Sequence, residues 1–132
     1  MSPAARRLAR WLTVTGVAYA SGAVDFIARP KAATRSLSMA GGEALADEEP
    51  GLYNALASAY MATIASLALS AARDPEERRA LLPPLLVAKA ASSGVLLYRY
   101  LRTQRRGFAV GAALDAALLG VTAGLYNSLE DR

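Results

Sequence analysis

The charged residues of this chain are concentrated in the gaps between four apolar blocks. Each block has about 20 residues, the length that an α-helix needs to cross the hydrocarbon core of a bilayer. A helix on the surface of a soluble protein would instead interleave a charged residue every third or fourth position. We therefore predict an all-α fold, a four-transmembrane-helix bundle that forms a single integral membrane domain over residues 1–132. The predicted spans are residues 8–28, 52–72, 81–101 and 107–127.

Composition alone leaves the class of protein open. Of the 132 residues, 54% are hydrophobic, which fits either a soluble helical bundle or a membrane protein. The mean hydropathy of +0.23 is low for a membrane protein, because it averages alanine-rich spans with a charged first loop. The distribution of the charges therefore decides in favour of the membrane.

The chain has no Cys and no His. This excludes disulfides, thiolate nucleophiles, His-ligated haem, His-based catalytic triads and metal sites built from Cys or His, so we expect no cofactor and no metal site. The net charge of +4 comes largely from Arg residues that flank apolar blocks, as in proteins anchored by anionic lipid headgroups. The expected partner is the lipid bilayer. With no stripe of basic and aromatic residues, nucleic acid is not expected.

The third and fourth blocks each hold one ionisable residue near the middle, Lys89 in the third and Asp115 in the fourth. The turn at residues 102–106 is short enough to force the two spans into an antiparallel hairpin. Counted from this turn, the two residues differ in depth by about 6 Å, a distance that a lysine side chain can reach. We predict a salt bridge between Lys89 and Asp115, with Ser93 at the depth of Asp115. Ionisable residues inside a membrane are functional candidates, so all three are candidates for a ligand site or ion pathway.

Asp25 and Tyr60 complete this candidate set. Asp25 lies four residues before Arg29, a spacing that favours a local ion pair at the membrane interface. The alternative for Asp25 is a carboxylate that lines a pathway together with Asp115. Tyr60 is a candidate for the wall of a cavity beside Lys89.

Small and polar residues recur at every fourth position in two of the blocks. In the second block they are Asn54, Ser58, Ala62, Ser66 and Ser70, and in the fourth they are Ala112, Ala116, Gly120 and Gly124. Such rows let helices approach closely, so we expect helix packing at both. The row in the fourth block lies on a different face from Asp115, which suggests one surface for the bundle and another for a partner or a second copy. A water or proton path is the alternative for the row in the second block.

The connections between the blocks carry further local signals. Residues 30–39 are compatible with a short interfacial helix. Asp74 followed by Pro75 predicts that the third helix begins before its apolar part, with a kink at Pro83 and Pro84. Lys and Arg residues are equally numerous on the two sides of the membrane, so orientation is not set, although the acidic first loop favours both termini inside.

The first block also has features of a signal peptide. Three arginines, Arg6, Arg7 and Arg10, stand at its start, and Ala18-Tyr19-Ala20 forms a small-x-small sequence of the kind that signal peptidases cleave. The apolar run continues beyond this point to Ile27. We therefore predict a retained transmembrane helix.

The layout resembles the DoxX-like group of small four-helix bacterial membrane proteins. The resemblance covers most of the chain: a first span that ends in Ala28-Arg29-Pro30-Lys31-Ala32-Ala33, a long loop with glycines, a third span with Lys89 to Ser93, and an aspartate in the fourth span at Asp115. It implies a location in the bacterial inner membrane. The chain lacks any cysteine motif, so no redox activity transfers from relatives associated with quinone-linked oxidoreductases.

Three functions compete at this point. The first is an accessory or scaffold subunit of a membrane complex or homo-oligomer, without catalytic machinery, in which Lys89 and Asp115 form a structural bridge. The second is a carrier or binding protein for a small lipophilic molecule or ion that uses this pair. The third is a membrane enzyme with Lys89 as a base or Schiff-base nucleophile and Asp115 as an acid or counter-ion. Two residues make a thin active site, so an enzyme is the least favoured.

Overall fold

The computed structural model describes residues 1–29, 32 and 50–130 as four long helices and one short 3₁₀ helix. The long helices are α1 (Pro3–Ala28), α3 (Pro50–Arg73), α4 (Leu82–Thr103) and α5 (Arg106–Glu130), and the 3₁₀ helix η1 (Arg79–Leu81) precedes α4. All four are long and apolar enough to cross a membrane. The protein is therefore an integral membrane protein with an all-α four-helix fold, which confirms the predicted fold class. The interfacial helix predicted at residues 30–39 falls on a stretch of which only residue 32 is described.

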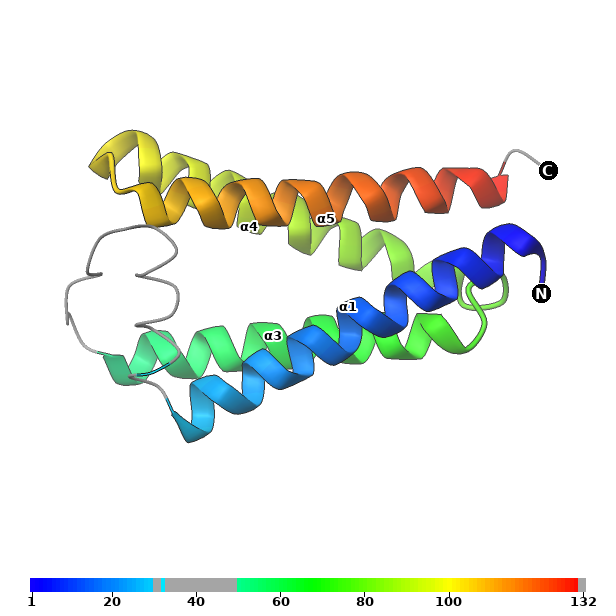
Figure 1. The fold of residues 1–132 in the computed structure, drawn as a ribbon, viewed down its shortest axis with the longest axis horizontal. Coiled ribbons are helices and arrows are strands. Elements are labelled where there is room, and N and C mark those ends of the chain that lie inside the picture. The colour runs from blue at the N-terminus through cyan, green and yellow to red at the C-terminus, as the bar shows by residue number, and fades with distance from the viewer. Residues whose placement is uncertain (30–31, 33–49, 131–132) are drawn as a thin grey trace.

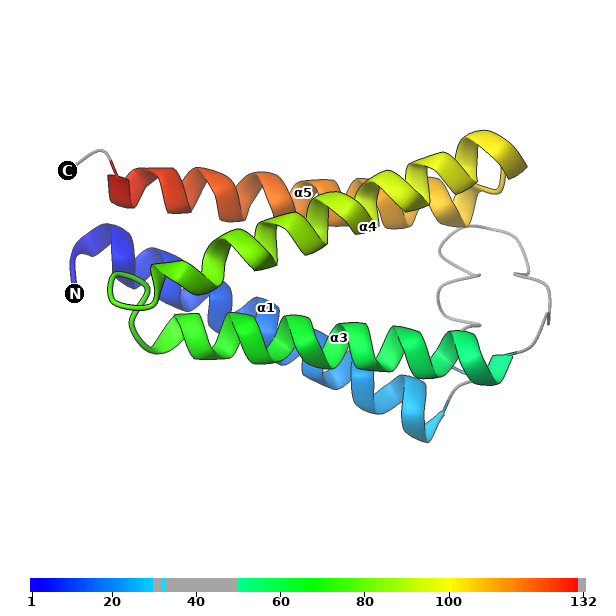
Figure 2. The same cartoon turned by 180° about the vertical axis from the view of Figure 1, so that it is seen from behind.

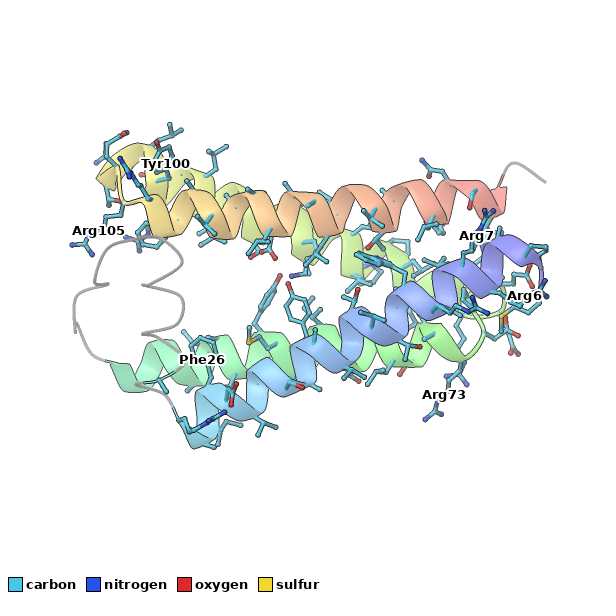
Figure 3. The ribbon with its side chains drawn as sticks, viewed as in Figure 1. Arg6, Arg7, Phe26, Arg73, Tyr100 and Arg105 are labelled. Carbon is cyan, nitrogen blue, oxygen red and sulfur yellow. The ribbon has the colours of Figure 1, made fainter. Side chains whose placement is uncertain are left out.

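The charged side chains mark the two ends of the bundle. Figure 3 shows Arg6, Arg7 and Arg73 at the end that holds both termini, and Arg105 with Tyr100 at the opposite end. The helices between these ends are apolar on average. This distribution fits a bundle that lies across the bilayer with its basic side chains at the headgroups.

Local sequence signals explain where two of the helices begin. The Ser2 hydroxyl caps α1 by accepting a hydrogen bond from the backbone N–H of Ala5 at 3.1 Å. Pro83 and Pro84 lie in the first turn of α4, where a missing backbone N–H costs no helical hydrogen bond. The predicted kink at these prolines is therefore wrong: they start the helix. The predicted early start at Asp74 is wrong as well, because its carboxylate caps a separate turn by accepting hydrogen bonds from the backbone N–H groups of Glu76 and Glu77.

The four long helices form two pairs, α1 with α3 and α4 with α5 (Figure 1). The pairs meet at the end of the bundle that carries both termini and separate towards the end with the α4–α5 turn. The reverse view in Figure 2 shows that α4 begins beside α3 and ends beside α5. The two pairs are thus joined along two lines, α4 against α3 and α1 against α5.

The apolar core lies where the pairs converge. Its fully buried members are Leu8, Leu12, Ile64, Ala68, Ala71, Leu82 and Leu85. The close approach of α1 to α3 depends on Gly16, because a Cβ atom at this position would lie 2.6 Å from Cγ of Leu69. Away from the core, large apolar side chains point outwards, among them Ile27 and Val87, which are 73% and 67% exposed. An apolar outer surface is expected for helices that lie in lipid.

The two rows of small residues do not pack as units within the chain. In α5, Ala112 is buried, but Ala116, Gly120 and Gly124 are exposed, and a Cβ atom on either glycine would meet nothing within 4 Å. In α3, Ser58 is buried whereas Ser66 is exposed. Among the described residues of these two rows, Ala112 and Ser58 are buried and Ser70 is half-buried, so packing inside the bundle involves only part of each row. Contact of the exposed ones with another chain stays a prediction.

Candidate functional site

The site is built around Lys89, whose side chain enters the middle of the bundle from α4. Lys89 is 2% exposed, and its Nζ lies 2.9 Å from Oδ1 of Asp115 on α5. The short turn between the two helices makes them antiparallel, so that the two residues meet at a similar depth. The salt bridge predicted from the sequence is confirmed. Its assignment as a ligand site or an ion pathway stays a prediction.

Asp115 accepts hydrogen bonds from two hydroxyl groups besides the lysine. The Tyr19 hydroxyl on α1 donates to Oδ1 at 3.0 Å, and the Ser92 hydroxyl donates to Oδ2. Ser93, which we expected at the depth of Asp115, donates instead to the backbone carbonyl of Ala112 at 3.0 Å. Successive residues of a helix point about 100° apart, so Ser92 faces the carboxylate and Ser93 faces the backbone of α5.

Tyr19 was missed by sequence reasoning. Lys89 Nζ donates a hydrogen bond to its hydroxyl and lies 3.9 Å from the centre of its ring. The two residues are 70 positions apart, so no local spacing relates them. The only signal was a tyrosine in the middle of an apolar block rather than at its end, where aromatic anchors belong. The small-x-small pattern Ala18-Tyr19-Ala20 instead favours a signal-peptide interpretation of this tyrosine.

Tyr60 on α3 is a second aromatic neighbour of the lysine. The centre of its ring is 5.4 Å from Lys89 Nζ, and its hydroxyl donates to the backbone carbonyl of Ala88 at 3.0 Å. An ammonium group near aromatic faces gains cation–π attraction, which is larger when the groups are desolvated. The buried ammonium therefore has one anionic partner, one hydroxyl partner and two rings around it.

Together these contacts form a network that includes all four long helices: Tyr19 from α1, Tyr60 from α3, Lys89 and Ser92 from α4, and Asp115 from α5. We call these five residues the central network. A charge in a dry interior is tolerated when it is paired and its remaining donors and acceptors are satisfied. The central network meets this condition with partners from the same chain.

An open groove of about 310 Å³ lies beside the central network. It is lined by Tyr60, Ala88, Ala91, Ser92 and Val95. Val95 and Ala91 are exposed, so the groove opens on the outer face of the bundle. Tyr60 and Ser92 belong to both the groove and the central network, whereas Lys89 does not line the groove. The predicted role of Tyr60 in the wall of a cavity beside Lys89 stays a prediction.

Asp25 lies apart from this site. Its carboxylate pairs with Arg29 one helical turn later, at the end of α1, where the two side chains are 48% and 69% exposed. The hydrogen bond from Arg29 to this carboxylate raises the pKa of the arginine. The local ion pair favoured from the sequence is confirmed. A pathway that joins Asp25 to Asp115 has no supporting contact among the residues that the structure describes.

A second polar contact joins α1 to α5 closer to the termini. Trp11 Nε1 donates to the Thr122 hydroxyl at 2.9 Å, and that hydroxyl donates in turn to the carbonyl of Leu118 at 2.7 Å. Thr15 lies one turn from Trp11 and one turn from Tyr19 on α1. It is buried, and its hydroxyl has no hydrogen-bond partner among the residues that the structure describes. The face of α1 towards α5 thus carries polar groups over about 12 Å of helix.

The chemical groups that the central network provides are a buried ion pair and hydroxyl groups. Within residues 1–29, 32 and 50–130, no three acidic side chains come together as a metal site would require. Comparison with known proteins adds no further assignment, because no family model, curated protein or solved structure matches the chain.

Proposed function

We propose that this protein is a non-catalytic accessory or scaffold subunit of a membrane complex or homo-oligomer. The observation that carries the proposal is the central network, in which both charged groups are surrounded by partners from their own chain. A buried ion pair whose partners all come from the same chain can be purely structural. Here Lys89 and Asp115 are 2% and 8% exposed, and both face neighbouring helices.

The position of the central network supports a structural role. The two helix pairs converge at the end that carries the start of α1 and separate towards the end with the α4–α5 turn (Figure 1). The hydrogen bonds of Tyr19 to Lys89 and Asp115 connect α1 to the α4–α5 pair. In lipid, where water does not compete, such polar contacts hold helices in one arrangement.

The outer surface of α5 supports association with another helix. Ala116, Gly120 and Gly124 are exposed on consecutive turns, and no side chain of the described residues covers the glycines. Small residues let a second helix approach closely enough for extensive van der Waals contact.

The resemblance to the DoxX-like group and its bacterial inner membrane location belong to the same proposal. They are supported by the four spans and by the lysine and aspartate in the third and fourth.

The test is the mass of the complex that the full-length chain forms in mild detergent. We expect an assembly larger than a monomer, retained when Lys89→Met and Asp115→Leu are combined, because the double variant removes the charges without leaving one of them unpaired. A monomer in every detergent that keeps the chain folded would contradict an assembly role. So would a folded double variant that has lost its partner, because the ion pair would then act in association itself.

Binding of a small lipophilic molecule is the second candidate function. The observation that favours it is the groove, which opens on the outer surface of the bundle and is lined in part by Tyr60 and Ser92 of the central network. A carrier or binding protein would take its ligand from the bilayer through this opening. Its test is saturable binding of an apolar probe by the purified chain in liposomes.

A further inference from the structure

We propose that the groove lined by Tyr60, Ala88, Ala91, Ser92 and Val95 binds an apolar molecule that carries one hydroxyl group, and that the groove selects it through hydrogen-bond acceptors alone. This inference rests on the second proposed function and names the chemical class of its ligand. It is independent of the scaffold role.

The depth and walls of the groove suit a molecule dissolved in the bilayer core. Tyr60 lies near the middle of α3 and Ser92 near the middle of α4. The other three lining residues, Ala88, Ala91 and Val95, have apolar side chains. A molecule with a large polar headgroup would have to bring that headgroup to the middle of the membrane, at a high cost in desolvation.

The hydroxyl groups of Tyr60 and Ser92 both donate their protons to acceptors within the protein. The Tyr60 hydroxyl donates to the carbonyl of Ala88, which can only accept. The Ser92 hydroxyl donates to Asp115, whose carboxylate is paired with Lys89 and therefore also accepts. Each hydroxyl oxygen keeps lone pairs but has no proton to give to a ligand. The groove therefore offers acceptors to a ligand and no donor.

The presence of acceptors without a donor predicts the chemical class of the ligand. A ligand hydroxyl can donate to the Tyr60 or the Ser92 oxygen and so regain a hydrogen bond in the hydrocarbon region, where an unpaired donor is costly. A ketone, an ester or an ether of the same shape brings only acceptors, which face the acceptor oxygens of the groove. The Asp115 carboxylate of the ion pair accepts the Ser92 proton and so fixes the direction of that hydroxyl. The groove therefore keeps its preference for a ligand that donates a hydrogen bond.

The test uses a photoactivatable dodecanol with a diazirine in its chain, added to liposomes that contain the full-length protein. Unlabelled dodecanol and dodecyl methyl ether serve as competitors, since the ether has the same oxygen without the proton. We expect crosslinks in α3 and α4 around the groove, and about fivefold weaker competition by the ether, the effect of one net hydrogen bond.

A matched pair of variants locates the site. Ala91→Phe fills the groove, whereas Ala90→Phe adds the same ring to the neighbouring exposed alanine, which does not line it. We expect crosslinking at α3 and α4 to be lost in the first variant and kept in the second. If Ala91→Phe does not fold, the two competitors still decide the question in the unmodified chain.

The outcomes separate the two levels of the proposal. Equal competition by dodecanol and its ether, with crosslinking still lost in Ala91→Phe, would overturn the hydroxyl selectivity and leave a lipophilic binding site. Crosslinking that neither competitor reduces, or that Ala91→Phe leaves unchanged, would overturn the binding site itself.

Discussion

The hydroxyl of Tyr19 on α1 donates a hydrogen bond to Asp115 on α5 across 3.0 Å, between residues 96 positions apart in the chain. The same hydroxyl accepts a hydrogen bond from Lys89 on α4. Tyr19 therefore connects the α1–α3 pair to the buried salt bridge of the α4–α5 pair. Its phenol group stabilises both the ion pair and the contact between the two helix pairs.

Replacing Tyr19 by phenylalanine tests this connection. The variant keeps the ring beside Lys89 but removes the hydrogen bond to Asp115, so we expect the free energy of unfolding to fall by about 1 to 2 kcal/mol. The measurement is denaturation of the protein in detergent micelles. Tyr98→Phe is the matched control, because Tyr98 is exposed and has no hydrogen-bond partner in the described part of the chain. Equal stability of the two variants would contradict the structural role of the Tyr19 hydroxyl.

The salt bridge itself predicts a non-additive pair of substitutions. Lys89→Met or Asp115→Leu alone leaves one charge unpaired in the bundle, at an expected cost of about 3 to 5 kcal/mol in unfolding free energy. The double variant should recover most of this loss, because no buried charge remains. The same denaturation measurement on all four proteins gives the coupling energy between the two residues. Two single losses that simply add in the double variant would show that the residues do not interact.

Trp11 is the single tryptophan of the chain, so the tryptophan fluorescence of the protein reports on the contact of this indole with Thr122. Thr122→Val removes the acceptor of the indole N–H, so we expect a lower unfolding midpoint and a change in the emission maximum of Trp11. Thr13→Val is the control, because among the described residues the Thr13 hydroxyl bonds only the carbonyl of Ala9 on its own helix, as Thr122 bonds that of Leu118. Unchanged fluorescence in Thr122→Val would show that the indole does not depend on this hydroxyl.

Two glycines should respond in opposite ways to the same substitution. At Gly16 a Cβ atom would lie 2.6 Å from Cγ of Leu69, so Gly16→Ala should separate α1 from α3 and lower the unfolding free energy by about 1 to 3 kcal/mol. At Gly120 nothing lies within 4 Å, and Gly120→Ala should leave the isolated chain as stable as before or slightly more stable. Denaturation of the monomer in detergent checks both. If Gly120→Ala weakens the assembly without changing the monomer, this face of α5 contacts a partner helix.

Glu76 gives a pH dependence outside the membrane. Hydrogen bonding by Ser2 lowers the pKa of Glu76 below its ordinary value of 4.5, chiefly through the Ser2 side chain and also through its backbone N–H, which donates to the carboxylate at 3.3 Å. A depressed pKa in the folded state means that the contact stabilises the protein above pH 4.5 and stops doing so as the pH falls through the folded value. The difference in stability between the unmodified chain and Glu76→Gln should therefore vanish in acid. Glu77→Gln is the control, at a neighbouring exposed carboxylate that has no hydrogen bond or ion pair within the described part of the chain, and it should show no such change.

The charge pattern was sufficient to predict the long helices and the meeting of Lys89 with Asp115. Helix length follows from the thickness of the bilayer, and a short turn fixes the register of two neighbouring spans, so both properties are local. The same locality explains the confirmed ion pair of Asp25 with Arg29. The predicted start and kink of the third helix failed because turn residues such as Asp74 and proline pairs suit several local structures, and tertiary packing selects among them.

By itself the sequence thus determined that four apolar helices form and that one buried cation faces one buried anion. Only the tertiary structure decided which other groups complete the central network. Tyr19 and Tyr60 come from the first two of the four long helices, and their distance from Lys89 depends on how the two helix pairs cross. The crossing results from packing at the core, where Gly16 and the small side chains of α3 let α1 and α3 approach closely. No spacing along the chain encodes that angle, because it is set by contacts between helices that are distant in sequence.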